Sequence, residues 1–181
     1  MDRIAEASPR FKARIAGALY LLSLLTAALT ELFVRGRLNI AGGLIAVAGM
    51  VGVTLLFYQI FKPVSRSLSL LAAFLNFVGL SFEVLRLQPQ GVNMAVVFTG
   101  CYCLLIGYLI FESTFLPRIL GAAMAFAGLG WVTYLSKPLV NFLSPYNLAC
   151  SLLGEGSVML WFLVMGVNVQ RWREQADPAG A

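Results

Sequence analysis

A single carboxylate lies inside a long apolar stretch near the C-terminus of the chain. Glu155 stands between Gly154 and Gly156 in the segment SLLGEGSVMLWFL, residues 151–163. Hydrocarbon does not solvate a charge, and acids within membrane spans commonly mark binding or proton-transfer sites. We therefore expect Glu155 to be protonated, paired, or beside a hydrated cavity. Its flanking glycines would let a neighbouring helix or a ligand come close.

Two further acids are related by their spacing. Glu31 and Glu83 are 52 residues apart, and each lies near the end of an apolar run. Arg86 follows Glu83 by three residues, which is a spacing that allows an ion pair on one helix face. The two acids therefore have two interpretations, as interfacial ion pairs that ease membrane insertion or as parts of a site.

The apolar segment around Glu83 also carries polar and small residues on one helical face. Asn76, Glu83 and Arg86 are spaced by seven and three residues, which places them on one inward-facing stripe. Ser151 lies one turn before Glu155 on the same face. The predicted site comprises the side chains that share this inward, outer-half placement: Glu155, Glu83, Glu31, Asn76, Arg86 and Ser151.

The residue types that are missing exclude several chemistries. The chain has no histidine, so it can form neither a histidine-based catalytic triad nor a histidine-ligated zinc or haem site. Cys101 and Cys103 lie two residues apart and would point in different directions on a helix. We expect no cofactor and no metal, and we expect the cysteines to be free.

Composition places the chain in a membrane. Of its 181 residues, 60% are hydrophobic and 12% are charged, against about 25% charged in soluble domains. Spans need about 20 apolar residues each, and the chain contains six such runs, none of them alternating as barrel strands do. We predict an all-α, single-domain bundle (residues 1–181) with a basic segment 1–14 and a tail 170–181. The spans are predicted at residues 15–34, 39–61, 67–86, 92–112, 117–136 and 147–169.

Basic residues near the span ends predict the orientation. They are more numerous on the side of the N-terminus, which favours cytoplasmic N- and C-termini in the inner (plasma) membrane. This asymmetry also accounts for the net charge of +5, so we expect the lipid bilayer rather than nucleic acid as partner. A homo-oligomer is left open. We expect an interfacial linker at residues 138–145 and a tail without regular structure at residues 175–181.

An internal repeat organises the spans. Arg14, Arg66 and Arg118 are spaced by 52 residues, and each precedes an odd-numbered apolar run. RIAGAL follows the first and RILGAAM follows the third, while the runs before the second and third end in YQIF and YLIF. We interpret these as three parallel two-helix repeats around a pseudo-threefold axis, although similar apolar alphabets can also align by chance.

Several short motifs resemble a known family. They are ELFVRG, KPVSRSLSLLAAF, GYLIFESTFLPRILG and the pair Gly154–Glu155. With them the chain is similar to a family of small bacterial membrane proteins catalogued as domain of unknown function 4386. The resemblance implies a membrane location and a helical fold, implies no activity, and marks as pattern residues Glu31, Pro117, Arg118, Gly121 and Glu155.

Three functions remain open at this point. The first is a pocket for a lipophilic small molecule in the outer half of the bilayer, with Glu155 acting as an acid or base and Glu83, Asn76 and Arg86 orienting the ligand. The second is a small permease coupled to protons or another cation. The third is a structural or regulatory subunit whose acids only join helices. The residues leave undecided whether the protein is an enzyme.

Overall fold

The computed structural model describes residues 8–33 and 37–177, without the side chains at positions 31, 32, 37 and 90. In this part all regular structure is helical, which confirms the all-α prediction. The long helices are α1 (Pro9–Phe33), α2 (Arg37–Phe61), α3 (Arg66–Val84), α4 (Met94–Glu112), α5 (Arg118–Val132) and α7 (Tyr146–Val164). Shorter elements are η1 (Pro89–Gly91), η2 (Thr133–Leu135), α6 (Lys137–Leu143) and α8 (Val169–Ala176). Six helical segments are long and apolar enough to cross a membrane, as predicted.

Two predicted span ends differ from the structure for local reasons. Helix α1 begins at Pro9 rather than at residue 15, because the Ser8 hydroxyl accepts the Phe11 N–H (3.3 Å) and proline suits the first helical position. Helix α7 ends at Val164 rather than at residue 169, because Gly166 adopts φ of 70°. This left-handed conformation is the usual stop signal of a helix.

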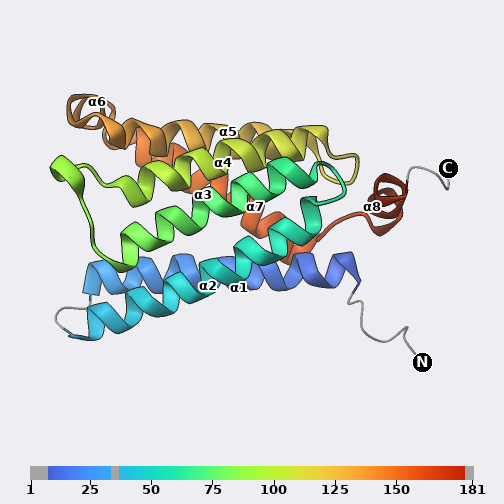
Figure 1. Ribbon diagram of the computed structural model, residues 1–181, viewed down its shortest axis with the longest axis horizontal. Helices are drawn as coiled ribbons and strands as arrows, with labels where there is room; N and C mark the ends of the chain where they lie inside the picture. The colour runs from blue at the N-terminus through green and yellow to red at the C-terminus, as the bar shows by residue number, and fades with distance from the viewer. Residues whose placement is uncertain (1–7, 34–36, 178–181) are drawn as a thin grey trace.

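The six long helices form a closed ring. Neighbouring pairs run in the order α1, α2, α3, α4, α5, α7 and back to α1, with α4 and α5 most closely packed and α2 and α3 making the fewest contacts. Helix α1 begins at the end of the bundle where α8 lies, and α6 lies at the opposite end (Figure 1). We call the half in which α1, α3 and α5 begin the closed half, and the other the open half.

The ring order is what three hairpins around a threefold axis require. Positions separated by 52 residues on the odd helices also occupy equivalent places, since Tyr20, Ala72 and Met124 are all 0% exposed. The register of the proposed repeat therefore agrees with the packing. Duplication of an ancestral hairpin stays a prediction.

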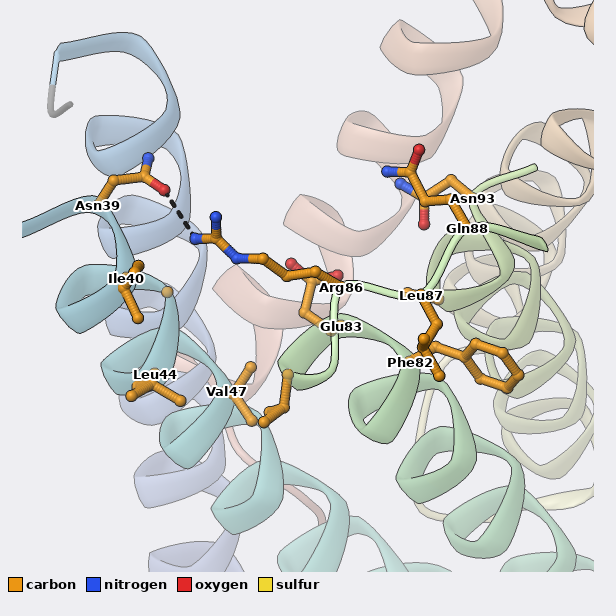
Figure 2. Close-up of a pocket in the computed structure, with 13 residues that line it drawn as sticks. Asn39, Ile40, Leu44, Val47, Phe82, Glu83, Arg86, Leu87, Gln88 and Asn93 are labelled. Atoms are coloured by element: carbon orange, nitrogen blue, oxygen red, sulfur yellow. Dashed lines mark hydrogen bonds between the residues drawn. The ribbon is translucent and has the colours of Figure 1, made fainter. Parts of the chain in front are cut away.

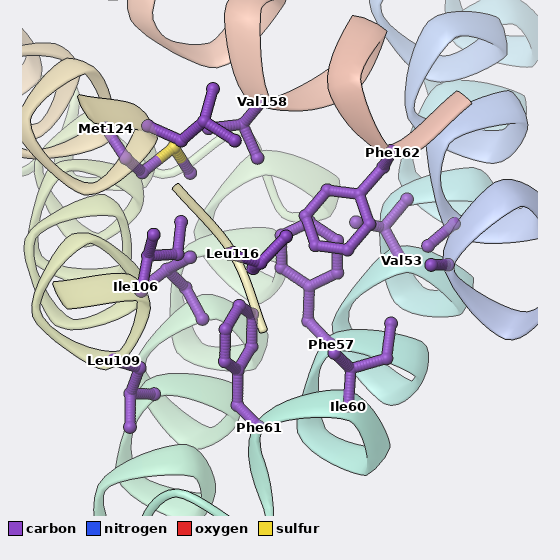
Figure 3. Close-up of a cluster of buried hydrophobic side chains, with 14 of the residues drawn as sticks. Val53, Phe57, Ile60, Phe61, Ile106, Leu109, Leu116, Met124, Val158 and Phe162 are labelled. Atoms are coloured by element: carbon purple, nitrogen blue, oxygen red, sulfur yellow. The ribbon is translucent and has the colours of Figure 1, made fainter. Parts of the chain in front are cut away.

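Aromatic and aliphatic side chains fill the closed half. Phe57 packs on Phe61 and Phe162 with ring centroids 5.8 and 5.0 Å apart, and Ile106 and Leu109 approach from α4 (Figure 3). These side chains are almost completely buried. Because close-packed apolar side chains leave little room for water, this cluster seals the closed half.

Helix α8 covers the end of this cluster. Trp172 donates its indole N–H to the Ile60 carbonyl of α2 (2.8 Å), and Gln175 donates to the Glu112 carbonyl of α4 (3.2 Å). The expectation of an unstructured tail is therefore wrong for residues 175 and 176, whereas residues 178–181 lie outside the described part. The amphipathic stretch at residues 138–145 forms helix α6 within the linker.

Glycines set the close packing of α4 against α5. An added methyl group at Gly121 would lie 2.8 Å from the Gly107 carbonyl, and one at Gly128 would lie 2.7 Å from the Gly100 carbonyl. Small residues commonly allow such contacts between membrane helices. Gly130 is packed in the same way against the Asn147 carbonyl of α7 (2.7 Å), whereas Gly43 on α2 has open space beside it.

We expect Gly121→Ala to destabilise the protein, because the new Cβ meets backbone on α4 and overpacking typically costs about 1–3 kcal/mol. Thermal unfolding in detergent measures the effect. Gly156→Ala is the matched control, since nothing lies within 4 Å of the added group, and we expect unchanged or slightly higher stability. Equal melting temperatures for the two variants would contradict the proposed α4–α5 contact.

Candidate functional site

Glu155 is the centre of a hydrogen-bond network near the middle of α7. Its side chain is only 3% exposed. The Tyr20 hydroxyl of α1 donates to Oε2 (2.5 Å), while the Trp131 indole of α5 and the Cys103 thiol of α4 (3.8 Å) contact Oε1. The carboxyl group therefore connects four of the six ring helices.

The chemistry of the partners defines how the carboxyl group is held. The indole N–H of Trp131 can only donate, so Oε1 must act as an acceptor. The Tyr20 hydroxyl can donate or accept, so the proton of this hydrogen bond can lie on the Tyr20 oxygen or on Oε2. All of these partners are neutral, so the hydrogen bonds of Glu155 involve no counter-ion.

A cavity of about 250 Å³ extends from Glu155 into the open half. We call it the inner chamber. Trp131 and Glu155 lie at its deep end, and Glu83 lies toward the outer end of α3. Along α1, α2, α3 and α4 its walls consist mainly of apolar or small side chains, such as Leu24, Ala46 and Leu80. The chamber is thus an apolar space with polar groups at both ends.

A second cavity of about 460 Å³ adjoins it, which we call the outer chamber. Figure 2 shows α2 side chains, such as Asn39 and Leu44, facing Glu83 and Arg86 across this space. The two chambers share Gly43, Val47, Glu83 and Ala95, so they lie directly beside each other. Arg86 donates to the Asn39 side chain (3.1 Å), which bridges α2 and the end of α3.

The structure brings only some of the predicted residues to the chambers. Glu155 lines the inner chamber, Arg86 the outer one and Glu83 both. Asn76 is buried and donates to the Thr54 hydroxyl (2.6 Å), so it joins α3 to α2. Ser151 donates to carbonyls of its own helix and of α5, at Asn147 (2.8 Å) and Ala127 (3.2 Å). Neither Asn76 nor Ser151 is among the lining residues of either chamber.

The predicted site contains three acids, and the structure describes the side chains of two of them. Glu83 and Glu155 line one cavity, whereas the Glu31 side chain lies outside the described residues. Glu31 therefore stays a predicted member of the site. Arg86 forms its side-chain hydrogen bond with Asn39, and Glu83 also interacts with another group of the protein.

Sequence reasoning missed the partners of Glu155. The sequence assigns no role to Tyr20 or Trp131, and it predicts only that Cys103 is a free cysteine. A signal existed, because Cys103 and Glu155 are 52 residues apart, the interval of the repeat. The same interval relates Ala27, Gly79 and Trp131, which all line the inner chamber.

No cluster of metal-ligating side chains occurs within the described ranges, and all three cysteines are free. Together, the six apolar helices, the buried acid and the adjoining chambers define a multi-pass membrane protein with an internal cavity.

Comparison with known proteins confirms the resemblance noted above. The family described as "Domain of unknown function (DUF4386)" matches residues 80–166, which run from the end of α3 through α7 and include Glu83 and Glu155. A protein of Archaeoglobus fulgidus described as "Uncharacterized protein" is 24% identical over 139 residues, covering 71% of this chain and 83% of that protein. No solved structure matches significantly.

The donor set around Glu155 leads to a stability prediction. Glu155→Leu leaves the Tyr20 and Trp131 donors buried without an acceptor, at a typical cost of about 1–3 kcal/mol for each such group. Glu155→Gln keeps an acceptor for Trp131 and offers an N–H to the Tyr20 oxygen, so it should lose much less. Thermal unfolding of the two variants measures the difference. A Glu155→Leu protein as stable as the wild type would show that the network contributes nothing.

Proposed function

We propose that this membrane protein binds a lipophilic small molecule in the inner chamber, with a hydrogen-bonding group of the ligand beside Glu155. The single observation that carries the proposal is a cavity that ends at a buried acid. Ligand sites are typically concave and mostly apolar, with a few placed polar groups and volumes of about 300–1,000 Å³. The inner chamber is mostly apolar, and the outer chamber of about 460 Å³ adds volume and polar groups beside it.

An unsatisfied hydroxyl supports a polar group on the ligand. Ser23 lines the inner chamber and is 2% exposed, yet its Oγ has no hydrogen-bond partner among the described residues. A buried polar atom without a partner is costly. A ligand hydroxyl or carbonyl would supply the missing hydrogen bond.

The thin contact between α2 and α3 supports access from the bilayer. The outer chamber is lined by these two helices and by the segment that leads into α4. Its rim includes Ile40, Leu44 and Val84, which are about half exposed and are apolar. A lipophilic molecule dissolved in the adjacent leaflet would meet the cavity at this seam. With cytoplasmic termini, that leaflet is the outer one of the inner membrane.

The closed half argues against the permease alternative. The aromatic cluster and helix α8 lie where a second exit would be needed. Alternating access would require the helices of this half to separate. A cavity that is open at one end fits binding, or chemistry on a bound molecule, better than transport.

The structural role has one specific observation in its favour. Glu155 has donors on three other helices, so it would hold the bundle together even without a ligand. Both roles are compatible, because Glu155 also lines the inner chamber. Ligand binding separates the two functions, since a purely structural acid gives no saturable site.

Gly43 offers a direct test. It lines both chambers, and an added Cβ there would meet nothing within 4 Å, so Gly43→Phe should project its ring into the chambers without disturbing the backbone. We expect saturable binding of the lipophilic fluorophore 1-aminoanthracene by the wild type in nanodiscs. The Gly43→Phe protein should bind it roughly tenfold more weakly or not at all, a factor that corresponds to about 1.4 kcal/mol.

Gly156→Phe is the matched control for the bulky substitution. Gly156 also has open space beside it but lines neither chamber. This variant should bind the fluorophore like the wild type. Equal binding by the Gly43→Phe and Gly156→Phe proteins, or no saturable binding by the wild type, would refute the proposed function.

A further inference from the structure

The chambers differ in the chemistry of their linings. The outer chamber is bordered by polar side chains, among them Asn39, Arg86, Gln88 and Asn93. Apart from Thr99, whose hydroxyl donates to the Ala95 carbonyl of its own helix (3.1 Å), the inner chamber has apolar walls up to the polar groups at its deep end. Between Ser23 and Thr30 on α1 this wall is seven residues long, or about 10 Å along the helix axis. Two polar regions are thus separated by an apolar passage.

Arg86 is the donor-rich group of the outer chamber. Its guanidinium has five N–H donors, and it makes one side-chain hydrogen bond, to Asn39, among the residues described. Such a group binds carboxylates and phosphates through parallel hydrogen bonds. The backbone of Arg86 has φ of 51° because this residue ends α3. The Leu87 N–H donates to the Phe82 carbonyl (3.0 Å) and the Arg86 N–H donates to the Glu83 carbonyl (3.1 Å), as in a common helix C-terminal motif.

Amide side chains border the outer chamber together with Arg86. The Asn93 oxygen accepts the Val96 N–H at the start of α4 (3.4 Å), so the amide N–H groups of Asn93 are the ones that can face a ligand. Glu83 also borders this chamber and interacts with another group of the protein. In Figure 2, Asn93 and Gln88 lie together beside the segment that follows Arg86.

We propose that the ligand is an acidic amphiphile with a second, neutral polar group at the far end of its apolar chain. Its anionic head binds Arg86 in the outer chamber, and its hydroxyl or carbonyl reaches Ser23 and Glu155. A medium-chain hydroxy fatty acid has this arrangement. The inference rests on the proposed function and adds the ligand class and its direction in the cavity.

Three probes separate the two polar contacts: 10-hydroxydecanoate, decanoate and 1,10-decanediol. Calorimetric titration of the wild-type protein in nanodiscs should give the tightest binding for 10-hydroxydecanoate. Loss of the head group or of the hydroxyl should each weaken binding by roughly tenfold, as expected for a charge-assisted hydrogen bond or a buried one.

Variants assign each contact to its residue. Arg86→Gln should remove the preference for 10-hydroxydecanoate over the diol, and Arg86→Lys should restore part of it. Ser23→Ala should remove the preference over decanoate and leave the head-group preference intact. The inverse pattern, in which Arg86→Gln affects only the hydroxyl preference, would show that the ligand lies the other way round and would overturn the proposal.

Failure of this inference is distinguishable from failure of the proposed function. If all three probes bind equally well and Arg86→Gln changes none of them, the ligand class is wrong while the cavity still binds lipophilic molecules. If 10-hydroxydecanoate shows no saturable binding, the ligand class is also wrong. The Gly43→Phe test then decides separately whether the chambers bind lipophilic molecules at all.

Discussion

A carboxyl group at the centre of a membrane bundle must receive its hydrogen bonds from other helices, because hydrocarbon offers none. Glu155 obtains them from Tyr20, Cys103 and Trp131, on three different helices. This requirement fixes α1, α4 and α5 around α7. It also marks the boundary between the two halves of the bundle, since apolar side chains fill the space on one side and a cavity begins on the other.

The cavity follows from how the hairpins meet. Helices α4 and α5 pack closely through glycines, whereas α2 and α3 make few contacts and are joined by the Asn76–Thr54 and Arg86–Asn39 hydrogen bonds. The outer chamber lies along this weaker seam. An uneven ring of helices thus combines a rigid wall with an accessible one, which is the arrangement that a binding protein for membrane-dissolved molecules needs.

The helices were predictable because membrane spans have a strong compositional signal, and the polar stripe with Asn76, Glu83 and Arg86 also indicated which face of one helix points inward. Glu155 was identifiable because a charge in hydrocarbon is costly. Its partners were not, since Tyr20 and Trp131 are ordinary amphipathic residues whose role depends on which helices are neighbours. Asn76 and Ser151 were correctly expected on inward faces, yet other helices cover them, and helical periodicity cannot distinguish a cavity from a contact.

The central claim is a cavity that opens at one end and stops at Glu155. In a protein whose native cysteines are replaced, Thr99→Cys lies in the inner chamber and Ser69→Cys is buried in the closed half. Labelling with a small membrane-impermeant thiol reagent, added to either side of sealed vesicles, tests the claim. We predict that Thr99→Cys reacts only from the side of the α3–α4 connection and that Ser69→Cys reacts from neither side. Labelling of Ser69→Cys, or of Thr99→Cys from the α8 side, would contradict the claim.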